Sequence, residues 1–308
     1  MGAPCEAGAH MTKIIVVGDI VTDIVAMIAG PITHASDTTA SIVSAGGGAG
    51  ANTAAWLAAA GVDVTLCGVV GDDDDGDIRL AELEVSGVAC AVRREPAAQT
   101  GRIIVLADGT ERSMLTDRGA NLCLEPDDID AALFGAADAV HLHLSGYALL
   151  DAASRPAALH ALATAAERGL TTSVDAASAG PLRRVGGTTF LEWVRATDAL
   201  FVNADEAQAL LETDESDPSL LAKSLARWCG VAIVKLGAGG AVSYVLGSSE
   251  VMSVPATEVN PLDTTGAGDA FAAGYLAAWL AGASNQDTLQ VATEMGTLAV
   301  GSIGARPE

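Results

Sequence analysis

A loop of small residues followed directly by an apolar helical stretch is the part of this 308-residue chain best suited to chemistry. Residues 263–269 read DTTGAGD, and residues 270–283 form an apolar run rich in alanine. Small residues let a ligand approach the backbone closely, and the unpaired N–H groups at the start of a helix attract an anion. The pattern therefore predicts a loop that holds a phosphate group by its main-chain N–H groups.

Asp269 ends this loop at the start of the predicted helix. One interpretation is structural, because aspartate commonly caps a helix or occupies its first turn. The other is catalytic: the carboxylate accepts the proton of a hydroxyl that attacks a phosphate held by the same loop. The segment alone leaves both interpretations open.

The elements that must position this loop alternate along the chain as apolar strands and helices rich in alanine and leucine. Continuous apolar strands separated by helices predict an α/β fold, with a parallel sheet covered on both faces. Ligands bind beyond the carboxyl ends of such strands, and two further glycine clusters, at 46–50 and 237–240, fall there. The predicted strands are 13–17, 64–69, 139–144, 171–175, 199–203 and 231–236; the predicted helices are 50–60, 76–85, 127–134, 154–167, 206–211 and 218–229.

Two stretches break the alternation. Residues 24–45 and 100–116 mix small, polar and β-branched residues without a helical period, which predicts a few additional strands. Each stretch lies beside a loop at the end of a main strand, so together they could form a small lid. The alternative is a pair of surface hairpins with no closing role.

The composition excludes several classes of protein. The chain has 39 Asp and Glu against 16 Lys and Arg, and its formal net charge of −23 argues against a nucleic-acid partner. Half of the residues are hydrophobic, which is enough for a large core and argues against disorder. The longest apolar run, residues 270–283, is too short to cross a bilayer of about 30 Å, so we expect no membrane partner.

The five cysteines are scattered along the chain without any CxxC spacing. We therefore expect reduced thiols, a cytoplasmic location and no zinc site. Residues 1–10 lack the basic and apolar regions of a signal peptide, and we interpret them as a leader or flexible N-terminus.

Five short motifs stand in order along the chain: 47–54 (GGAGANTA), 71–76 (GDDDDG), 203–206 (NADE), 236–240 (LGAGG) and 263–269 (DTTGAGD). They resemble those of the ribokinase-like (PfkB-type) carbohydrate kinase family, and the resemblance covers most of residues 13–305. The resemblance implies a three-layer α/β/α sandwich with a central, mostly parallel sheet and a small β lid. Its core would comprise residues 11–23, 46–98 and 121–308, and its lid residues 24–45 and 99–120.

The resemblance assigns the phosphate end of the site. Asp269 would be the general base, and the N–H groups of Gly266, Ala267 and Gly268 would form the anion hole. Glu206 would hold Mg²⁺ through water, which suits a cation that keeps most of its hydration. The nucleotide ATP would contact Asn203, Lys235, Gly237, Gly240 and Thr265, and Asp263 and Thr265 match a monovalent-cation site that makes K⁺ a plausible activator.

The resemblance also assigns the acceptor end. Asp23, Gly48 and Asn52 match contacts to the hydroxyl groups of the substrate. Ribokinases carry a Glu where Ser145 stands here, which favours a different acceptor. Arg118 lies in a segment where keto-deoxygluconate kinases hold the acceptor's carboxylate, and Arg102 is a second basic candidate. Both arginines could instead pair only with neighbouring acids.

Several of these residues have plainer explanations. Asn203 and Glu206 suit a helix N-terminus with an acid in its first turn, and Asn52 could cap a helix. The acidic run 72–75 resembles a metal chelate but is more typical of a solvated loop. His141 and His143 point to the same face of a strand, where local hydrogen bonds are the expected role.

The sequence thus predicts an ATP- and Mg²⁺-dependent kinase that phosphorylates a primary hydroxyl of a small sugar or sugar derivative. A nucleoside kinase acting on adenosine or pseudouridine is one alternative. A non-catalytic ligand-binding protein on the same fold is another, since fold does not fix function. Related lids pair edge to edge, so we also expect a homodimer formed through the lid.

Overall fold

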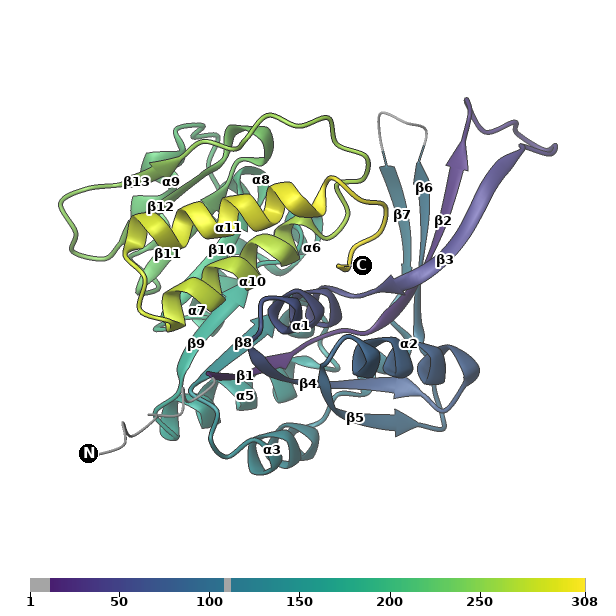
Figure 1. Ribbon diagram of the computed structural model, residues 1–308, viewed down its shortest axis with the longest axis horizontal. Coiled ribbons are helices and arrows are strands. Elements are labelled where there is room, and N and C mark those ends of the chain that lie inside the picture. The colour runs from purple at the N-terminus through teal and green to yellow at the C-terminus, as the bar shows by residue number, and fades with distance from the viewer. Residues whose placement is uncertain (1–11, 108–111, 308) are drawn as a thin grey trace, which may run out of the picture.

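The computed structural model describes residues 12–107 and 112–307, and the leader predicted at residues 1–10 lies outside them. The larger of its two sheets has nine strands, which run through the middle of the molecule (Figure 1). These are β1 (Lys13–Val17), β4 (Asp63–Gly71), β5 (Ala89–Glu95), β8 (His141–Ser145), β9 (Thr171–Asp175), β10 (Ala199–Asn203), β11 (Val231–Lys235), β12 (Ala241–Val245) and β13 (Met252–Val254). Their spatial order is β13-β12-β11-β10-β9-β8-β1-β4-β5.

The neighbouring strands β11, β10, β9, β8, β1, β4 and β5 are all parallel, as predicted. Strand β12 pairs antiparallel with both β11 and β13. The chain therefore carries the predicted ribokinase-like sandwich with its mostly parallel sheet. All six predicted strands are present within two residues of their expected limits.

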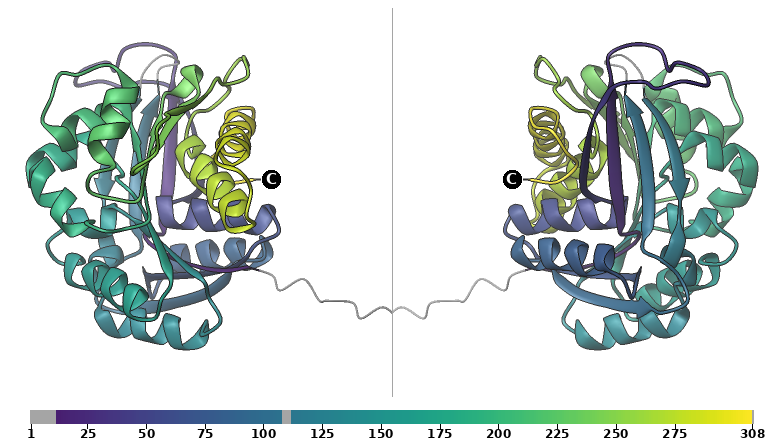
Figure 2. Two further views of the ribbon diagram at one scale, coloured as in Figure 1. Left: turned by 90° about the vertical axis from the view of Figure 1, so that its left-hand side faces the viewer. Right: turned by 90° about the vertical axis from the view of Figure 1, so that its right-hand side faces the viewer.

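Helices cover both faces of the sheet, as the two side views in Figure 2 show. Successive side chains of a strand point to opposite faces, so Ile14 and Val16 of β1 enter one apolar core and Ile15 and Val17 enter the other. The first core is closed by α1 (Ala49–Ala59), α2 (Asp74–Val85), α10 (Ala267–Leu280) and α11 (Asn285–Ala299). The second is closed by α3 (Pro126–Gly135), α5 (Arg155–Glu167), α6 (Ala179–Val185), α7 (Gly187–Trp193), α8 (Ala204–Leu211) and α9 (Pro218–Leu225).

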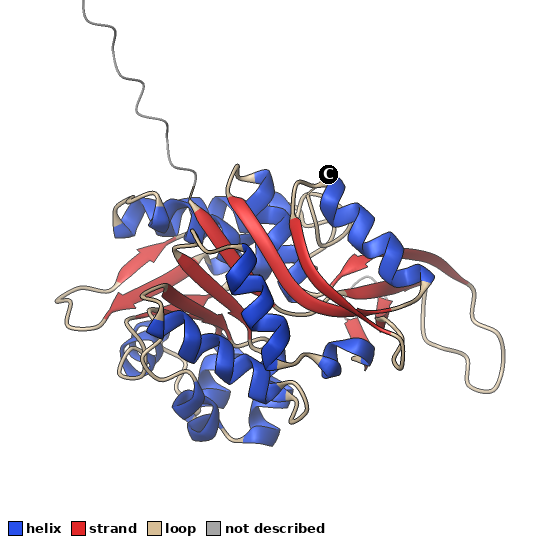
Figure 3. Cartoon of the chain, turned by 90° about the horizontal axis from the view of Figure 1, so that it is seen from below, coloured by secondary structure: helices blue, strands red, loops and turns tan. Residues whose placement is uncertain are grey.

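A separate four-stranded sheet rises beside the sandwich (Figure 1; Figure 3, seen from below). Its strands, in spatial order, are β3 (Ala40–Gly47), β2 (Val21–Ile28), β6 (Gly101–Ala107) and β7 (Arg112–Asp117). The two segments predicted as lid strands therefore pair with each other. Strands β2 and β3 also extend past the predicted lid limits, so that Asp23 and Gly47 lie at the base of this sheet.

The acidic run 72–75 leads from β4 into α2; Asp72 and Asp74 are exposed, as expected of a solvated run, whereas Asp73 makes structural hydrogen bonds. Asp73 caps α2 by accepting a hydrogen bond from the N–H of Gly76 at 2.9 Å. It also accepts hydrogen bonds from the N–H and hydroxyl of Thr100, at 2.8 and 2.6 Å, next to the start of β6. These bonds hold the pKa of Asp73 below its usual value although burial opposes the shift. Asp73 thus ties the base of the lid to the core.

In the described part of the chain, no helix combines the length and apolarity needed to cross a membrane.

Candidate active site

The loop 263–269 ends at the first turn of α10, which begins three residues earlier than predicted. Its N-cap, Gly266, has a left-handed backbone with φ 76°, and a Cβ there would lie 2.4 Å from the carbonyl oxygen of Ala305. Only glycine fits this conformation and this close approach. No side chain caps this helix end, and the N–H of Ala267 makes only a long bond, of 3.4 Å, to the carbonyl oxygen of Thr264. A helix N-terminus of this kind suits an anion.

Asp269 lies in this first turn and accepts a hydrogen bond from Asn52 Nδ2 of α1 at 2.9 Å. Burial raises the pKa of Asp269 to about 8; the charge of Asp175 adds to the rise, whereas Asn52 and Lys235 oppose it. A carboxyl whose pKa lies near neutrality suits a general base. Two residues predicted to share one site, Asp269 and Asn52, therefore meet although 217 positions separate them.

Lys235, at the end of β11, lies beside the anion hole. Its Nζ forms an ion pair with Asp175 Oδ2 at 2.6 Å and would be 3.2 Å from a Cβ added at Gly268. Burial lowers the pKa of Lys235, but the carboxylates of Asp175 and Glu206 outweigh it and the pKa is raised. The ammonium group is therefore positively charged where a transferred phosphoryl group would bind.

A cavity of about 630 Å³ opens next to Lys235 and α10. This volume suits a nucleotide-sized ligand. Three of the five residues predicted to contact ATP, Lys235, Gly237 and Gly240, line it, together with Ala267 and Gly268 of the predicted anion hole. The predicted Asn203 and Thr265 are not among the described lining residues, whereas Phe271, Thr293 and Thr297 contribute to its wall.

Asn203 and Glu206 form a capping box at the start of α8, the plainer of their two explanations. Glu206 Oε2 and Oε1 accept hydrogen bonds from the backbone N–H and side-chain Nδ2 of Asn203, both at 2.7 Å. Asn203 Oδ1 accepts in return from the N–H of Glu206 at 2.9 Å. Burial raises the pKa of Glu206 to about 7, while Lys235 lowers it.

At the acceptor end, Asp23 is buried at the base of the lid against Gly47. A Cβ at Gly47 would lie 2.2 Å from Asp23 Oδ2, so glycine makes room for the carboxyl group. Burial raises the pKa of Asp23 to about 6, and the nearby Arg306 opposes the rise. Asp23 Oδ1 is buried without a hydrogen-bond partner among the described residues, as expected of a group that binds a ligand.

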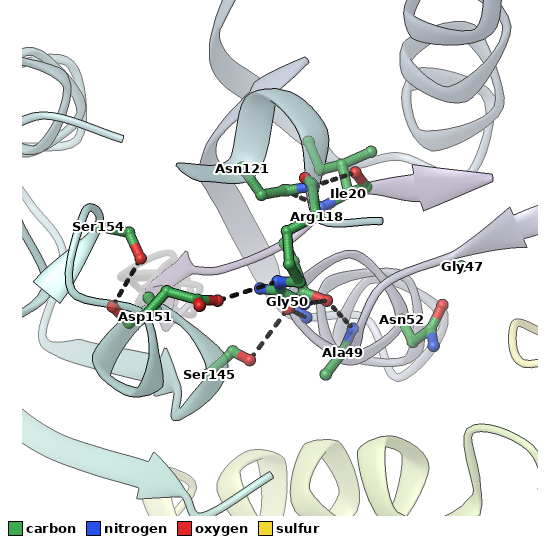
Figure 4. A network of polar contacts seen from close by, with 12 residues as sticks. Ile20, Gly47, Ala49, Gly50, Asn52, Arg118, Asn121, Ser145, Asp151 and Ser154 are labelled. Atoms are coloured by element: carbon green, nitrogen blue, oxygen red, sulfur yellow. Dashed lines mark hydrogen bonds and ion pairs between the residues drawn. The ribbon is translucent and has the colours of Figure 1, made fainter. Parts of the chain in front are cut away.

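Asp19, which follows β1, joins several of the acceptor-end residues; its partners Ala49, Arg118 and Ser145 are labelled in Figure 4. Its carboxylate accepts hydrogen bonds from Ser145 Oγ at 3.0 Å, from the N–H of Ala49 at 3.2 Å and from Arg118 Nη1 at 3.3 Å. Gly48 has φ 97°, and a Cβ there would lie 2.4 Å from the carbonyl oxygen of Asp19. Asp19 thus fixes the glycine turn, Ser145 and Arg118 in one network.

The remaining candidates lie away from this centre. Arg102 is exposed and pairs with Asp75 at 2.7 Å, which agrees with its plainer explanation. The imidazoles of His141 and His143 both contact the Ser173 hydroxyl at 2.8 Å, so these buried histidines satisfy local hydrogen bonds.

Asp263 Oδ1 and Oδ2 accept hydrogen bonds from the N–H groups of Thr265 at 2.8 Å and Gly304 at 3.1 Å. This ties the predicted K⁺ segment to the C-terminal residues.

A family model described as pfkB family carbohydrate kinase matches residues 11–308, nearly the complete chain. The chain belongs to this family. The predicted family and phosphotransferase class are confirmed, and the protein is a sugar or nucleoside kinase.

Three similar proteins illustrate the range of the pfkB family. The ATP-dependent ribose-1-phosphate kinase of Halopiger xanaduensis is 37% identical over 270 residues, which cover 85% of this chain and 82% of the relative. The 2-dehydro-3-deoxygluconokinase of Thermoproteus tenax is 30% identical over 310 residues, covering 98% and 91%. The crystal structure of adenosine kinase from Sinorhizobium meliloti matches with a TM-score of 0.84 and 28% identity, covering 97% of this chain and 96% of that one.

The phosphate end of this pfkB-family kinase fits Mg²⁺. Asp175, Glu206 and Asp269 provide three carboxyl groups around the single ammonium of Lys235. Within the described residues no three His, Cys, Asp or Glu side chains cluster closely enough to chelate a metal directly. Several carboxyl groups that do not form a chelating cluster suit a cation that is held mainly by water and by the phosphates of the substrate.

Asp19, Asp175 and Arg306 are among the site residues that the sequence analysis did not identify. Asp19 carries no motif signal beyond its place after Gly18. Arg306 lies near the C-terminus, yet it contacts Asn52, 254 positions earlier, and the carbonyl oxygen of Gly47. Such a long-range contact has no local signature.

Proposed function

We propose that this kinase transfers the γ-phosphate of ATP to a primary hydroxyl of a small anionic sugar, and that ribose 1-phosphate is its acceptor. The observation that carries the transfer is the position of Asp269. Its buried carboxyl lies in the first turn of α10, beside the uncapped N–H groups and the Lys235 ammonium. Base, anion hole and positive charge therefore surround one point at the edge of the nucleotide cavity.

In this mechanism Asp269 accepts the proton of the acceptor's hydroxyl as the hydroxyl oxygen attacks the γ-phosphorus; the bond from this phosphorus to the β–γ bridging oxygen breaks, and ADP leaves. The N–H groups of Gly266, Ala267 and Gly268 and the Lys235 ammonium stabilise the charge that develops on the phosphoryl oxygens. Glu206 would hold Mg²⁺ through water, and the bound cation would supply further neutralisation of the phosphate charge. Asp23 and Asn52 orient the hydroxyl groups of the acceptor, and closure of the lid excludes water.

Arg118 supports an anionic acceptor. Its guanidinium is mostly buried and stacks over the ring of Tyr147 at 4.7 Å. Its Nε lies 3.6 Å from Asp151 and makes no hydrogen bond among the described residues. A buried donor with unused capacity favours an oxyanion ligand, which guanidinium binds in a bidentate manner. Two of the similar kinases are named for anionic sugars, a ribose phosphate and a sugar acid.

The proposal is tested by ADP release in a coupled assay with ATP, Mg²⁺ and a panel of acceptors, with and without K⁺. The panel is ribose 1-phosphate, 2-dehydro-3-deoxygluconate, ribose, fructose, adenosine and pseudouridine. We expect the highest kcat/KM with ribose 1-phosphate, and a larger KM for it in Arg118→Met, by roughly tenfold to a hundredfold, as for a lost charged contact. Preferential turnover of a neutral sugar or nucleoside, unaffected by Arg118→Met, would contradict the anionic acceptor.

A further inference from the structure

We propose that Arg306 is a positioning residue, which fixes the Asn52 side-chain amide so that Nδ2 faces the Asp269 carboxylate. The inference rests on the proposed role of Asp269 as general base. Arg306 Nε donates a hydrogen bond to Asn52 Oδ1 at 3.2 Å, and Asn52 Nδ2 donates one to Asp269 Oδ2 at 2.9 Å. The three side chains form a chain of hydrogen bonds that reaches from the C-terminal segment to the base.

The direction of this chain follows from the chemistry of its first member. A guanidinium group has only donors, whereas a carboxamide has an acceptor end and a donor end. Oδ1 of Asn52 must therefore face Arg306, and its donor end must face Asp269. Without Arg306 the amide could rotate by a half turn, and Oδ1 would then face the carboxylate.

The structure holds the Arg306 guanidinium in place from several sides. Nη2 donates to the carbonyl oxygen of Gly47 at 2.9 Å, and Nη1 lies 3.5 Å from Glu82 Oε2. A Cβ at Gly46 would be 2.4 Å from Nη1, so the glycine leaves the space that the guanidinium occupies. Trp56 Nε1 donates to the carbonyl oxygen of Ala305 at 3.0 Å and anchors the segment that carries Arg306. Only 11% of the Arg306 side chain is exposed.

The orientation of the amide matters because Asp269 is already biased toward its neutral form. A donor directed at the carboxylate favours ionisation, and an acceptor in the same place favours the protonated acid. A base has to be ionised to accept a proton, so Arg306 acts on the reaction through Asn52. The other groups that face Asp269 are Asp175 of β9, Lys235 of β11, Asp19 after β1 and Tyr147 of the short helix α4 (Tyr147–Leu150).

The test is the pH profile of kcat/KM, which reports ionisation in the free enzyme. In Arg306→Met we expect the acid limb to move up by about one pH unit, so that activity at about pH 7 falls roughly tenfold and recovers at high pH. Arg306→Lys keeps a donor and should restore much of the profile. Arg195→Met removes an exposed arginine that pairs with Glu192, and this matched control should retain the wild-type profile.

Two further variants separate positioning from a general structural effect. Gly46→Ala keeps Arg306 but pushes away the end of its flexible side chain, so it should shift the acid limb in the same direction. In an Asn52→Leu background, Arg306→Met should cause no additional shift, because the amide through which it acts is gone. An unchanged acid limb in both Arg306→Met and Gly46→Ala, or an equal shift in the Asn52→Leu background, would overturn the proposal.

A second readout needs no acceptor. The side-chain amide signal of Asn52 in the ¹⁵N-labelled apo enzyme, assigned by its loss in Asn52→Leu, should follow the titration of Asp269. In Arg306→Met this titration should move to higher pH. Wild-type inactivity with every acceptor would count against the proposed function alone, whereas an unmoved amide titration would count against the role of Arg306.

Discussion

Asp269 is the residue on which the proposed transfer most depends. Asp269→Asn keeps the shape of the side chain but removes its basicity, so we expect kcat to fall by about 10²- to 10⁴-fold. Binding of Mg·ATP, measured by calorimetry, should persist because the anion hole and Lys235 are unchanged. Unchanged turnover in this variant would contradict the assignment of the base.

The pKa of Asp269 also predicts how stability depends on pH. Burial raises its pKa in the folded state from 3.8 to about 8, so ionising this carboxyl costs stability as pH rises through that range. A carboxamide at this position does not ionise, and Asp269→Asn should therefore unfold at a higher temperature than wild type above about pH 8. The difference should shrink toward about pH 3, where both side chains are neutral in the folded state and the wild-type carboxyl is largely neutral in the unfolded state. Thermal unfolding of the two proteins across this range checks the prediction, and an equal difference at every pH contradicts it.

The sequence was most informative where function and local pattern coincide. Residues 263–269 contain the proposed anion hole and the proposed base. The phosphate-binding loop could be predicted because a small-residue loop before a helix has a local signature, whereas the catalytic interpretation of Asp269 came from the family resemblance. The contacts of Arg306 could not be predicted in this way, because its partners, Asn52 and Gly47, are adjacent to it only in the folded chain. Asp19 was overlooked for the same reason: its contacts with Ser145 and Arg118 join separate loops.

Helix α8 offers a direct comparison between a structural and a catalytic role for one residue. In Glu206→Gln the amide oxygen can still accept the capping-box hydrogen bond from the N–H of Asn203, whereas the negative charge and the second bond, from Asn203 Nδ2, are lost. If Glu206 holds Mg²⁺ through water, the Mg²⁺ concentration for half-maximal activity should rise by about 10- to 100-fold. Asp205→Asn, in the same first turn, is the matched control and should leave the Mg²⁺ requirement unchanged. If Glu206→Gln and wild type need the same Mg²⁺ concentration for half-maximal activity, Glu206 has only the capping role.

The interior elements were predicted well and the peripheral ones poorly. Strands such as β10 are apolar throughout because both faces are buried, and such runs are easy to recognise. Strand β5 lies at the edge of the sheet and carries Arg93, Arg94 and Glu95, so its sequence lacks that pattern. Strand β13 and the mixed helix α11 were missed for a related reason, because each packs on the core with one face only. Strand β12 contributes Ala241 to one core and Val242 to the other, but its polar Ser243 interrupts the apolar run.

The lid presents apolar side chains on both of its faces. The pairing of its strands places Ile42, Ile104 and Leu115 on one face and Met27, Val43 and Met114 on the other, and all six are exposed. A single lid can turn only one face toward its own acceptor site. The opposite face is then left to water unless another molecule covers it, and exposed apolar patches of this kind mark interaction surfaces.

A second copy of the chain accounts best for this face, because the lid also has two open edges, β3 and β7, which pairing between copies would protect. We therefore expect a homodimer at micromolar concentration in size-exclusion chromatography with light scattering. Ile42 and Val43 are neighbours that probe opposite faces of the lid, and Ile42→Asp or Val43→Asp, whichever lies in the interface, should yield monomers. Phe134→Asp replaces an apolar residue of α3 that is 84% exposed and should leave the dimer intact. A monomeric wild type, or a dimer that survives both lid substitutions, would contradict assembly through the lid.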